Sequence, residues 1–411
     1  MDERVLLRGL FDTAVAAADP AHVVPPHLPA PPPGRTLVLA AGKAAAAMAR
    51  AVEQNWPGAI EGIAVTRYGH GVECQRIEVV EAGHPLPDAA GQGAASRFLS
   101  AAVRLGPDDL LLFLVSGGAS ALLVGPQPGL SLPDKQAVNR ALLEAGAPIA
   151  EMNCLRKHLS AIKGGRLAAA AAPARVVTLA ISDVPGDDPA VIGSGPTVPD
   201  PTTCAEALAI AGQYQVVLPE IARRALEQGG WETVKPGDPR LVRTGYTIVA
   251  RPSDALAAAA ARARALNLNV MNLGDDLQGE ACDLGVMHAG LARQHAPGVL
   301  ISGGEATVTL DAPGGTGGPN LEYLLSLAVA LDGAPNVHAI ACDTDGIDGS
   351  AAAAGATIGP DTLARARAAG MDARAMLAGH DSYEFFRRLE DLVVTGPTWT
   401  NVNDFRALLI G

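Results

Sequence analysis

The sequence predicts a two-domain α/β protein, with a mostly parallel sheet flanked by helices in the N-terminal domain and a second α/β domain after it. Short apolar runs alternate with glycine turns and alanine-rich segments along the chain, which is the pattern of repeated β–α units. The 411 residues exceed what a single hydrophobic core usually serves. Hydrophobic residues make up 48% and charged residues 18%, so the composition is that of an ordinary folded protein.

The clearest β–α units lie in the first half of the chain. Residues 36–40 are a predicted buried strand, residues 41–42 a turn and residues 43–54 a helix. Residues 110–115 and 176–181 are further predicted strands, and each runs directly into a turn that begins with serine. Continuous apolar runs of this kind fit the strands of a parallel sheet, because helices cover both of its faces.

A polar segment rich in prolines and glycines, residues 231–244, predicts the domain boundary. It gives an N-terminal domain of residues 1–240 and a C-terminal domain of residues 241–411. We expect the second domain to open with a strand at 246–250 and a helix at 253–265. Its further strands are expected near residues 269–273, 298–301, 337–341 and 392–395.

Charge, hydropathy and cysteine usage restrict the partners. The formal net charge of −12 disfavours nucleic acid, which needs a basic surface. The longest strongly apolar run, residues 110–115, is far shorter than the roughly 20 residues that span a bilayer, so no membrane partner is expected. The five cysteines form no CxxC pair and no secretory signal is apparent. We therefore expect a cytoplasmic protein that acts on small molecules.

Ligands of open α/β sheets bind beyond the carboxyl ends of the strands, so the residues there form the candidate site. Two glycine turns at such ends can aim backbone N–H groups at phosphate oxygens, namely Ser116-Gly117-Gly118-Ala119-Ser120 and Ser302-Gly303-Gly304-Glu305. The aspartates at other strand ends can hold Mg²⁺ or accept a hydroxyl proton, namely Asp183, Asp187, Asp343 and Asp345. Together these features favour phosphoryl transfer. Taken singly, a glycine after a strand is more often structural, and the acidic loop at 343–349 fits a solvated turn equally well.

Lysine usage singles out Lys43. The chain contains five lysines among 31 lysines and arginines, so it mostly uses arginine where arginine serves. A compact ammonium group fits between phosphate oxygens in a way that a guanidinium does not. Lys43 begins a predicted helix directly after a strand, where phosphates bind in such folds. The alternative is that codon bias and chance leave a lysine at this position.

The segment 153–166 is the basic cluster that an acidic protein needs in order to bind an anionic substrate. If the segment is helical, Arg156, Ser160 and Lys163 lie at positions i, i+4 and i+7 of one face. That face can clamp a carboxylate or a phosphate. The alternative is a solvated basic stripe.

Several common nucleotide-binding and catalytic motifs are absent from the sequence. It contains no GxxxxGK[ST] loop, no protein-kinase HRD or DFG set and no GxSxG turn. Gly91-Gln92-Gly93 matches a dinucleotide fingerprint only loosely and follows no strand directly, so nicotinamide binding is disfavoured. The histidines show no metal-ligand spacing, and we expect His84 and His158 to be structural.

A series of short motifs runs through nearly the whole chain: GHPLPD (83–88), SGGASAL (116–122), RKHLS (156–160), KGGRL (163–167), ISDVPGDD (181–188), GSGPT (193–197), DTDGIDG (343–349), TGPT (395–398) and NVND (401–404). In this order they resemble the glycerate 2-kinase family, whose members end in a MOFRL-type domain. The resemblance implies a Rossmann-like N-terminal domain, a second α/β domain of the MOFRL type and an active site in the cleft between them. It also implies phosphorylation of D-glycerate to 2-phosphoglycerate with ATP, and we expect Mg²⁺ as the metal.

With this reaction in view, we assign roles by position. Lys43 is assigned to the phosphoryl group in flight, and Arg156 to the substrate carboxylate. Asp183 and Asp187 are assigned to the metal or to the hydroxyl proton. We expect further substrate contacts from Ser160, Lys163 and Asn403. Both glycine turns and Asn320 are expected to bind the nucleotide. Asp183, Asp343 and Asp345 are expected to bind the metal.

Two positions depart from the family pattern. Pro319 stands where many members have the arginine of Gly-Gly-Arg-Asn-Gln-Glu, so the role of that arginine falls to Arg156 or Lys163. Trp399 stands where a smaller residue is usual, which predicts a narrower pocket near Asn401. Some relatives carry the label hydroxypyruvate reductase, so an NAD(P)H-dependent reductase is the second hypothesis and a non-catalytic binding protein the third. The sequence leaves the oligomeric state open, with a homodimer as one alternative.

Overall fold

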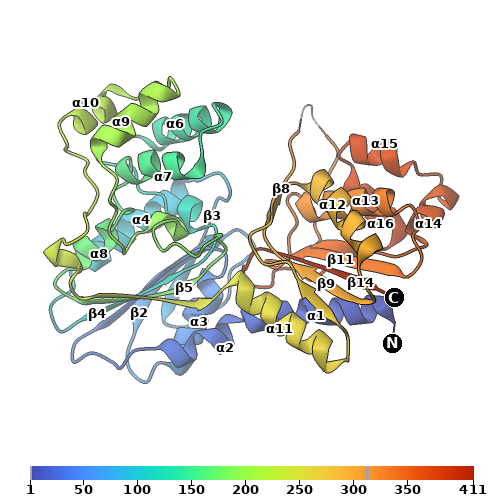
Figure 1. Cartoon of the computed structure of the whole chain (residues 1–411). Coiled ribbons are helices and arrows are strands. Elements are labelled where there is room, and N and C mark those ends of the chain that lie inside the picture. The colour runs from blue at the N-terminus through green and yellow to red at the C-terminus, as the bar shows by residue number, and fades with distance from the viewer. Residues whose placement is uncertain (1, 311–313) are drawn as a thin grey trace. The chain divides into compact units, whose positions relative to one another are not determined.

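The computed structural model describes residues 2–310 and 314–411, which divide into two compact units (Figure 1). The first unit comprises residues 20–249. The second comprises residues 250–411 together with the chain up to Asp19. This division differs from the predicted one at 240 and 241 in two respects, because the N-terminal helix belongs with the C-terminal residues and the boundary lies after residue 249.

The first unit is built on a six-stranded sheet with the order β3-β2-β1-β4-β5-β6. The strands are β1 (Thr36–Ala41), β2 (Glu61–Arg67), β3 (Ile77–Ala82), β4 (Leu110–Val115), β5 (Arg175–Ile181) and β6 (Thr244–Ala250). Strands β1 to β5 pair in parallel, which confirms the predicted sheet type. Every residue of β1 and β4 is buried, because helices cover both faces of the sheet at its centre.

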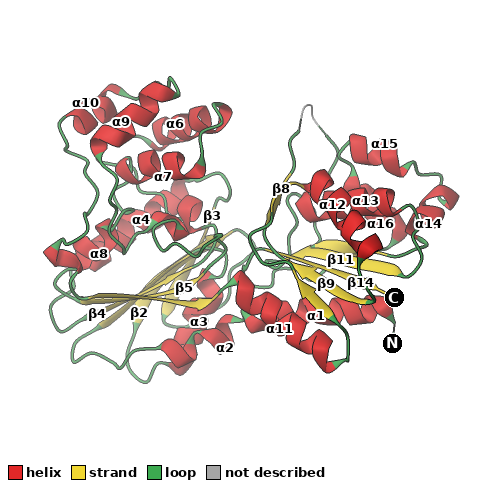
Figure 2. Ribbon diagram, in the orientation of Figure 1, coloured by secondary structure: helices red, strands yellow, loops and turns green. Residues whose placement is uncertain are grey.

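Helices lie on both faces of this sheet (Figure 2). One face is covered by α2 (Pro20–Val23) and α3 (Ala45–Asn55), and the other by α4 (Ala89–Ala102) and α8 (Arg166–Ala171). The buried side of α3 is mostly alanine, whose small side chain lets the helix approach the strands closely. Among the residues that the structure describes, no helix combines the length and the apolarity needed to cross a bilayer.

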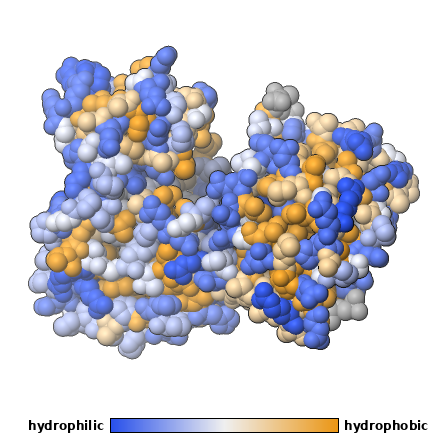
Figure 3. Space-filling model, viewed as in Figure 1, coloured by the Kyte–Doolittle hydropathy of each residue, from blue (hydrophilic) through white to orange (hydrophobic). Residues whose placement is uncertain are grey.

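A separate helical layer caps the α4 side of the first unit. It consists of α6 (Leu132–Glu144), α7 (Ile149–His158), α9 (Cys204–Gln213) and α10 (Glu220–Glu227). These helices share a small apolar core that contains Leu142, Leu155 and Trp231. Figure 3 shows mainly hydrophilic side chains at the outer end of the layer, near α10. That helix buries Ala222 and Leu226 and exposes its arginines and glutamates.

The strand at 246–250 was predicted to open the second domain, and this prediction is wrong. The structure places it, as part of β6, at the edge of the first sheet beside β5. The segment leading into β6 is already paired there, since the Val176 N–H donates to the Arg243 carbonyl at 3.0 Å. The breaker-rich segment at 231–244 is therefore a loop that returns to the first sheet, and the boundary follows the returning strand.

The second unit contains a mixed six-stranded sheet with the order β13-β12-β11-β14-β9-β7. Its strands are β7 (Val270–Asn272), β9 (Gly298–Ser302), β11 (Val337–Asp343), β12 (Gly355–Ile358), β13 (Leu392–Val393) and β14 (Asp404–Ile410). Only the β7–β9 pairing among these is parallel, so the sheet of the predicted second α/β domain is a mixed one. The strand β14 inserts between β9 and β11 and runs antiparallel to both, and β12 runs antiparallel to β11 and β13. A short pair, β8 (Gln278–Glu280) and β10 (Glu305–Thr307), lies apart from this sheet.

Helices cover both faces of the second sheet as well (Figure 1). On one side lie α12 (Ala281–Gln294), α13 (Pro319–Leu331), α14 (Thr362–Ala368), α15 (Ala373–Ala378) and α16 (Ser382–Leu389). On the other lie α11 (Pro252–Ala265) and the N-terminal helix α1 (Glu3–Ala17). Phe11 of α1 packs against Phe405 of β14 with ring centroids 6.0 Å apart. Arg4 pairs with the buried Asp391 at 2.6 Å, so both apolar and charged contacts dock α1 on this unit.

The docking of α1 gives a stability prediction. Phe11 is 1% exposed, so Phe11→Ala should lower the free energy of unfolding of the second unit by about 3–5 kcal/mol, the cost of a large core truncation. Val5 lies on the same helix and is 64% exposed, so Val5→Ala should change it by no more than about 0.5 kcal/mol. Urea unfolding of both variants followed by circular dichroism measures the difference. Equal costs for the two variants would show that α1 is not docked as described.

Candidate active site

The first unit has a topological switch point between β1 and β4. From this central pair the chain adds β2 and β3 on one side and β5 and β6 on the other. Ligands of open α/β sheets bind at the carboxyl ends of the strands where the order reverses in this way. β1 runs directly into Gly42 and Lys43, and β4 runs directly into the turn at 116–120. The structure therefore brings two of the predicted site segments together.

Backbone contacts lock these two segments to each other. The Lys43 N–H donates to the Gly117 carbonyl at 2.8 Å, and the Ala44 N–H donates to the Ser116 Oγ at 3.0 Å. Gly42 has a φ of +129°, and a Cβ on it would lie 2.2 Å from the Ser116 Oγ. Only glycine permits both that conformation and that approach. The glycine before Lys43 is thus required by the contact between the two loops.

The side chain of Lys43 lies close to the glycine turn and to His84. Gly118, with a φ of +79°, leads into the short helix α5 (Ala119–Leu122). A Cβ on Gly118 would lie 3.0 Å from the His84 Nε2 and 3.2 Å from the Lys43 Cγ. The stem of the Lys43 side chain and the His84 imidazole therefore lie beside a glycine turn, and turns of this kind can bind anions. His84 was expected to be structural, and its GHPLPD motif was the only sequence signal for its position here.

Ser120, at the end of the turn, is held by a buried lysine. The Lys163 Nζ donates to the Ser120 carbonyl at 2.9 Å, to the Ser120 Oγ at 3.0 Å and to the Gly193 carbonyl at 3.3 Å. The Ser120 Oγ also lies 2.7 Å from the Ser194 Oγ. Lys163 is 1% exposed, and burial together with neighbouring positive charges holds its pKa well below the usual value of a lysine. Its amine is directed at the glycine turn from the protein interior.

The predicted basic helix face does not form. Helix α7 ends at His158, so Ser160 and Lys163 lie beyond it in a turn rather than one and two turns further along. The Ser160 Oγ donates to the Gly125 carbonyl at 3.1 Å and accepts the Lys163 N–H at 3.3 Å, which is a structural role for a fully buried side chain. Arg156 stays on helix α7.

The basic segment is not a solvated stripe either. The Arg156 Nε donates to the Asn139 Oδ1 at 3.3 Å, and burial lowers the pKa of this guanidinium. The Lys135 Nζ, also buried, donates to the carbonyls of Arg156 at 3.1 Å and Leu159 at 3.0 Å. Lys157 pairs with Asp200 at 3.3 Å. Most cationic side chains of this region thus bond to groups within the helical layer rather than to solvent.

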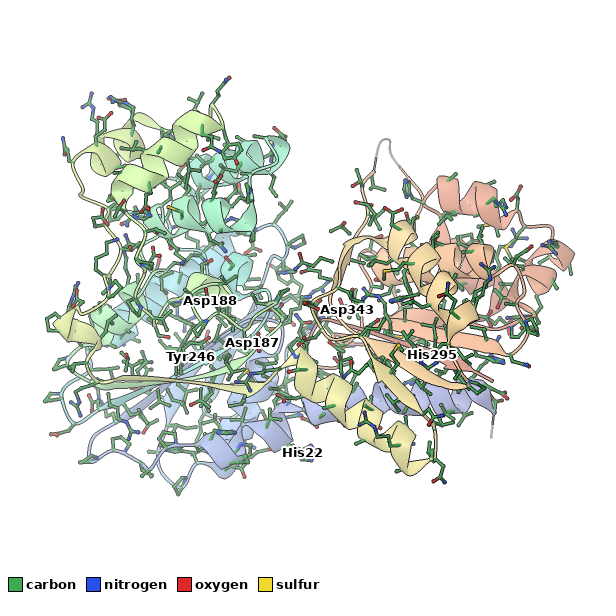
Figure 4. The ribbon with its side chains drawn as sticks, in the orientation of Figure 1. His22, Asp187, Asp188, Tyr246, His295 and Asp343 are labelled. Atoms are coloured by element: carbon green, nitrogen blue, oxygen red, sulfur yellow. The ribbon has the colours of Figure 1, made fainter. Side chains whose placement is uncertain are left out.

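The aspartates of the first unit lie on the loop after β5, the strand next to β4. Asp183 follows the strand by two residues and is half-buried. Asp187 has a φ of +54°, and its N–H donates to the Val184 carbonyl at 3.0 Å. Figure 4 shows Asp187 and Asp188 on this loop near Tyr246 of β6. Lys43, the glycine turn and Asp183 consequently follow the carboxyl ends of three adjacent strands.

Strand register gathers the predicted residues of the second unit at one sheet edge. In the β14–β9 pair Arg406 lies opposite Ser302, and in the β11–β14 pair Asp404 lies opposite Asp343. The carboxyl ends of β9 and β11 therefore lie on either side of the beginning of β14. The turn at 302–305, the acidic loop and Asn403 meet there, as the sequence predicted for strand-end residues.

A buried polar network connects these loops. The Asn320 Nδ2 donates to the Asp404 Oδ1 at 2.6 Å and to the Asp348 Oδ1 at 3.2 Å. The Asp348 carboxylate also accepts the N–H groups of Asn320 at 3.0 Å and Leu321 at 2.8 Å, at the start of α13. Burial raises the pKa of Asp348 to about 7, against the effect of these hydrogen bonds. The Arg406 guanidinium completes the network by donating to the Gly303 carbonyl at 2.8 Å.

The acidic loop itself is organised by its own turns. The Asp343 Oδ1 accepts the Asp345 N–H at 2.9 Å, and the Asp345 Oδ1 accepts the Ile347 N–H at 2.8 Å. Asp345 is 1% exposed, whereas Asp343 is half-buried. The Thr344 Oγ1 donates to the Asn403 carbonyl at 2.6 Å, which ties the acidic loop to the segment before β14. The loop is therefore largely buried and is not the solvated turn that its composition also allowed.

The buried lysine of α6 gives a pH prediction. Burial lowers the pKa of Lys135 from 10.5 to about 7, so the unfolded chain binds one more proton than the folded chain between those values. The Lys135 amine therefore makes the free energy of unfolding rise between about pH 7 and 10.5, by up to about 1.4 kcal/mol per pH unit. In Lys135→Met, the rise in stability with pH should be correspondingly smaller. Urea unfolding of both proteins at about pH 7.5 and 9.5, which lie between the two pKa values, measures this difference. An identical pH dependence of the two unfolding free energies would contradict the prediction.

Two family models match different parts of the chain. Residues 6–227 match a family described as a domain of unknown function, DUF4147, and residues 298–404 match the MOFRL family. The glycerate 2-kinase of Pyrococcus horikoshii is 40% identical over 384 residues, which cover 90% of this chain and 86% of that protein. A protein of Agrobacterium vitis that is provisionally named a hydroxypyruvate reductase is 56% identical over 418 residues, covering 99% of this chain and 94% of that protein.

The same relationship is evident in three dimensions. The crystal structure of glycerate kinase from Thermotoga maritima superposes with a TM-score of 0.89 at 35% sequence identity, and the match covers 99% of each chain. Both family matches, the full-length relatives and the shared fold agree with the motifs that the sequence presents in order. The chain belongs to the glycerate kinase family.

Proposed function

We propose that this chain is an ATP-dependent glycerate 2-kinase. In this reaction the C2 hydroxyl oxygen of D-glycerate forms a bond to the γ-phosphorus of ATP, and the hydroxyl proton passes to a base. The bond between the γ-phosphorus and the β–γ bridging oxygen breaks, which releases ADP and 2-phosphoglycerate. The observation that carries the proposal is the position of Lys43 and His84 beside the glycine turn at the β1–β4 switch point. The family relationship supports the substrate and its C2 position.

Lys43 and the glycine turn have complementary tasks in this proposal. Transfer of a phosphoryl group depends chiefly on positioning and on neutralising negative charge. The ammonium group of Lys43 supplies a point charge for the phosphoryl oxygens, and His84 lies where it can donate a further hydrogen bond. The backbone amides at 116–120 supply dipoles for the nucleotide phosphates.

Lys163 acts through the turn in this proposal rather than on the substrate. Its Nζ is fully buried and bonded to Ser120, so it fixes the end of the turn and adds positive charge behind it. Arg156 stays our candidate for the glycerate carboxylate. It is half-buried, its guanidinium contacts the neutral side chain of Asn139, and a bidentate guanidinium matches a carboxylate.

The carboxylates that we propose as metal ligands are those of Asp183, Asp343 and Asp345. Their hard oxygen atoms are the donors that Mg²⁺ prefers, and the ion would neutralise charge on the triphosphate. We keep Asp187 as the alternative acceptor of the hydroxyl proton. Ser302, Gly303, Gly304, Glu305 and Asn320 remain the proposed nucleotide contacts of the second unit, with Asn320 placed by its bonds to Asp348 and Asp404. Asn403 remains a proposed substrate contact. We propose a cytoplasmic location, and a homodimer remains one alternative for the oligomeric state.

An NAD(P)H-dependent hydroxypyruvate reductase is the second candidate, because a close relative carries that name. The structure disfavours it at the fingerprint-like segment Gly91-Gln92-Gly93. Gly91 and Gly93 lie inside helix α4, and a Cβ on Gly91 would lie 2.6 Å from the Leu122 carbonyl, so that glycine serves helix packing. A dinucleotide fingerprint instead forms the turn between the first strand and its helix.

One assay separates the two candidates. With D-glycerate, ATP and Mg²⁺ the purified chain should release ADP and form 2-phosphoglycerate, identified against 3-phosphoglycerate by chromatography and mass. With hydroxypyruvate and NADH, but no ATP, the absorbance of NADH should stay constant. Glycerate-independent ADP release, or oxidation of NADH, would refute the kinase proposal.

The role of Lys43, which lies in the turn before α3, is tested against a control residue on that helix. Lys43→Ala should lower kcat by roughly 10²–10⁴-fold, the usual effect of removing one charge that stabilises a transition state. Arg50→Ala, at an exposed position on α3, should leave kcat within about twofold, because a solvated charge at the surface contributes little. Both variants should keep the thermal midpoint of the parent. Near-parental kcat in Lys43→Ala would remove this lysine from the mechanism.

A further inference from the structure

Three side chains with metal-binding atoms meet in the helical layer of the first unit, outside the proposed kinase site. His158 is the last residue of α7, Cys204 is the first residue of α9, and Glu232 lies on the segment after α10. One ligand atom from each lies within 4.8 Å of the other two. The His158 Nε2 and the Glu232 Oε2 are 3.8 Å apart. An ion placed among the three atoms would contact a nitrogen, a sulfur and an oxygen.

The state of His158 points to a ligand. The side chain is fully buried, and its Nδ1 lies 2.8 Å from the Cys154 carbonyl. A carbonyl can only accept, so the proton is on Nδ1 and the Nε2 carries a lone pair. This Nε2 has no hydrogen-bond partner among the described residues, although it is buried. Metal-binding histidines characteristically donate their second ring N–H to a carbonyl in this way.

The other two side chains are held in place by the backbone and by a lysine. Cys204 is 2% exposed, and its N–H donates to the Glu232 Oε1 at 2.7 Å. The Glu232 Oε2 is 2.6 Å from the Lys235 Nζ. The carboxylate is thus oriented from both of its oxygens, with Lys235 as the competing cation. Glu232 is the exposed member of the group, so an ion has a route of entry from solvent.

We propose that the His158 Nε2, the Cys204 Sγ and the Glu232 Oε2 bind one Zn²⁺ ion. Imidazole, thiolate and carboxylate are the three ligand types of protein zinc sites, and water supplies a fourth ligand from the exposed side. The thiol gives its proton to solvent when the ion binds. A thiolate is a poor ligand for Mg²⁺, so this site is chemically distinct from the metal site of phosphoryl transfer.

The ion would act as a cross-link of the helical layer. Its ligands come from the end of α7, the beginning of α9 and the segment that leads back towards β6. The apolar core of this layer is small, and its free cysteines form no disulfide. An ion that binds only the folded layer stabilises it by mass action. It would also fix the end of α7, from which the chain continues to Lys163 and its contacts with Ser120.

The test uses the full chain without a polyhistidine tag, stripped of metal by a chelator and free of ATP and glycerate. Titration with Zn²⁺ should show one equivalent bound per chain and a higher thermal midpoint. Titration with Co²⁺ should produce a near-ultraviolet thiolate-to-metal charge-transfer band. Cys204→Ser should lose the band, because the band requires the thiolate. Cys204→Ser and His158→Asn should each weaken Zn²⁺ binding by more than about 100-fold, since the loss of a residue that only supports a ligand typically costs no more than that. Cys74→Ser keeps all three ligands and should bind both metals like the parent.

The design remains decisive if a buried substitution prevents folding. Glu232→Gln changes an exposed side chain and keeps an oxygen to accept the Cys204 N–H, so this variant should fold and still lose the Zn²⁺-dependent rise in thermal midpoint. The proposal fails if the parent shows no such rise, if Glu232→Gln keeps it in full, or if the charge-transfer band survives in Cys204→Ser. None of these outcomes depends on kinase activity, so the zinc site and the proposed function stand or fall separately.

Discussion

The parallel pairing of β1 with β4 is the constraint on which the first unit depends. The two strands align residue for residue from Thr36 opposite Leu110 to Ala41 opposite Val115, and all twelve side chains are buried. Because both strands end at the same level, the loops that follow them are neighbours and exchange backbone hydrogen bonds. A slip of one residue would turn each apolar side chain to the wrong face and separate Lys43 from the glycine turn.

Three lysines of the first unit, Lys135, Lys157 and Lys163, are buried inside an acidic protein. Lys135 and Lys163 are buried and donate mainly to carbonyl oxygens, and both lie near Arg156. Burying amines beside other cations works against stability, since each neighbour raises the cost of charging the next. Proteins keep such arrangements where a function needs them. Here the lysine amine behind Ser120 links the helical layer to the turn that we assign to the nucleotide.

How much the sequence reveals depends on where the side chains point. The strand at 110–115 is predicted to the residue because six apolar residues stand between Asp109 and Ser116. β14 escapes prediction because it carries Arg406, whose charge suggests the surface although the side chain is fully buried against Asp404. The glycine turns are predicted from their position after strands. The predicted basic helix face does not form, because α7 ends at His158 and the lysine side chains turn inward. Neither of these features is evident from the sequence. The position of His84 beside Gly118 is also not evident from the sequence, because the two residues are brought together only by folding.

The contribution of α1 to the second unit makes that unit discontinuous in sequence, with the whole first unit inserted between two of its elements. During synthesis the apolar side of α1, with Leu7, Leu10 and Phe11, is made before the whole of the first unit. Its partner Phe405 is added only after the first unit and most of the second have been made. At about 5–20 residues per second the helix waits for roughly 20–80 s. During this interval the sheet that covers the apolar side of α1 in the folded protein does not yet exist. We therefore expect chaperones to bind the exposed apolar side chains of α1 in the nascent chain.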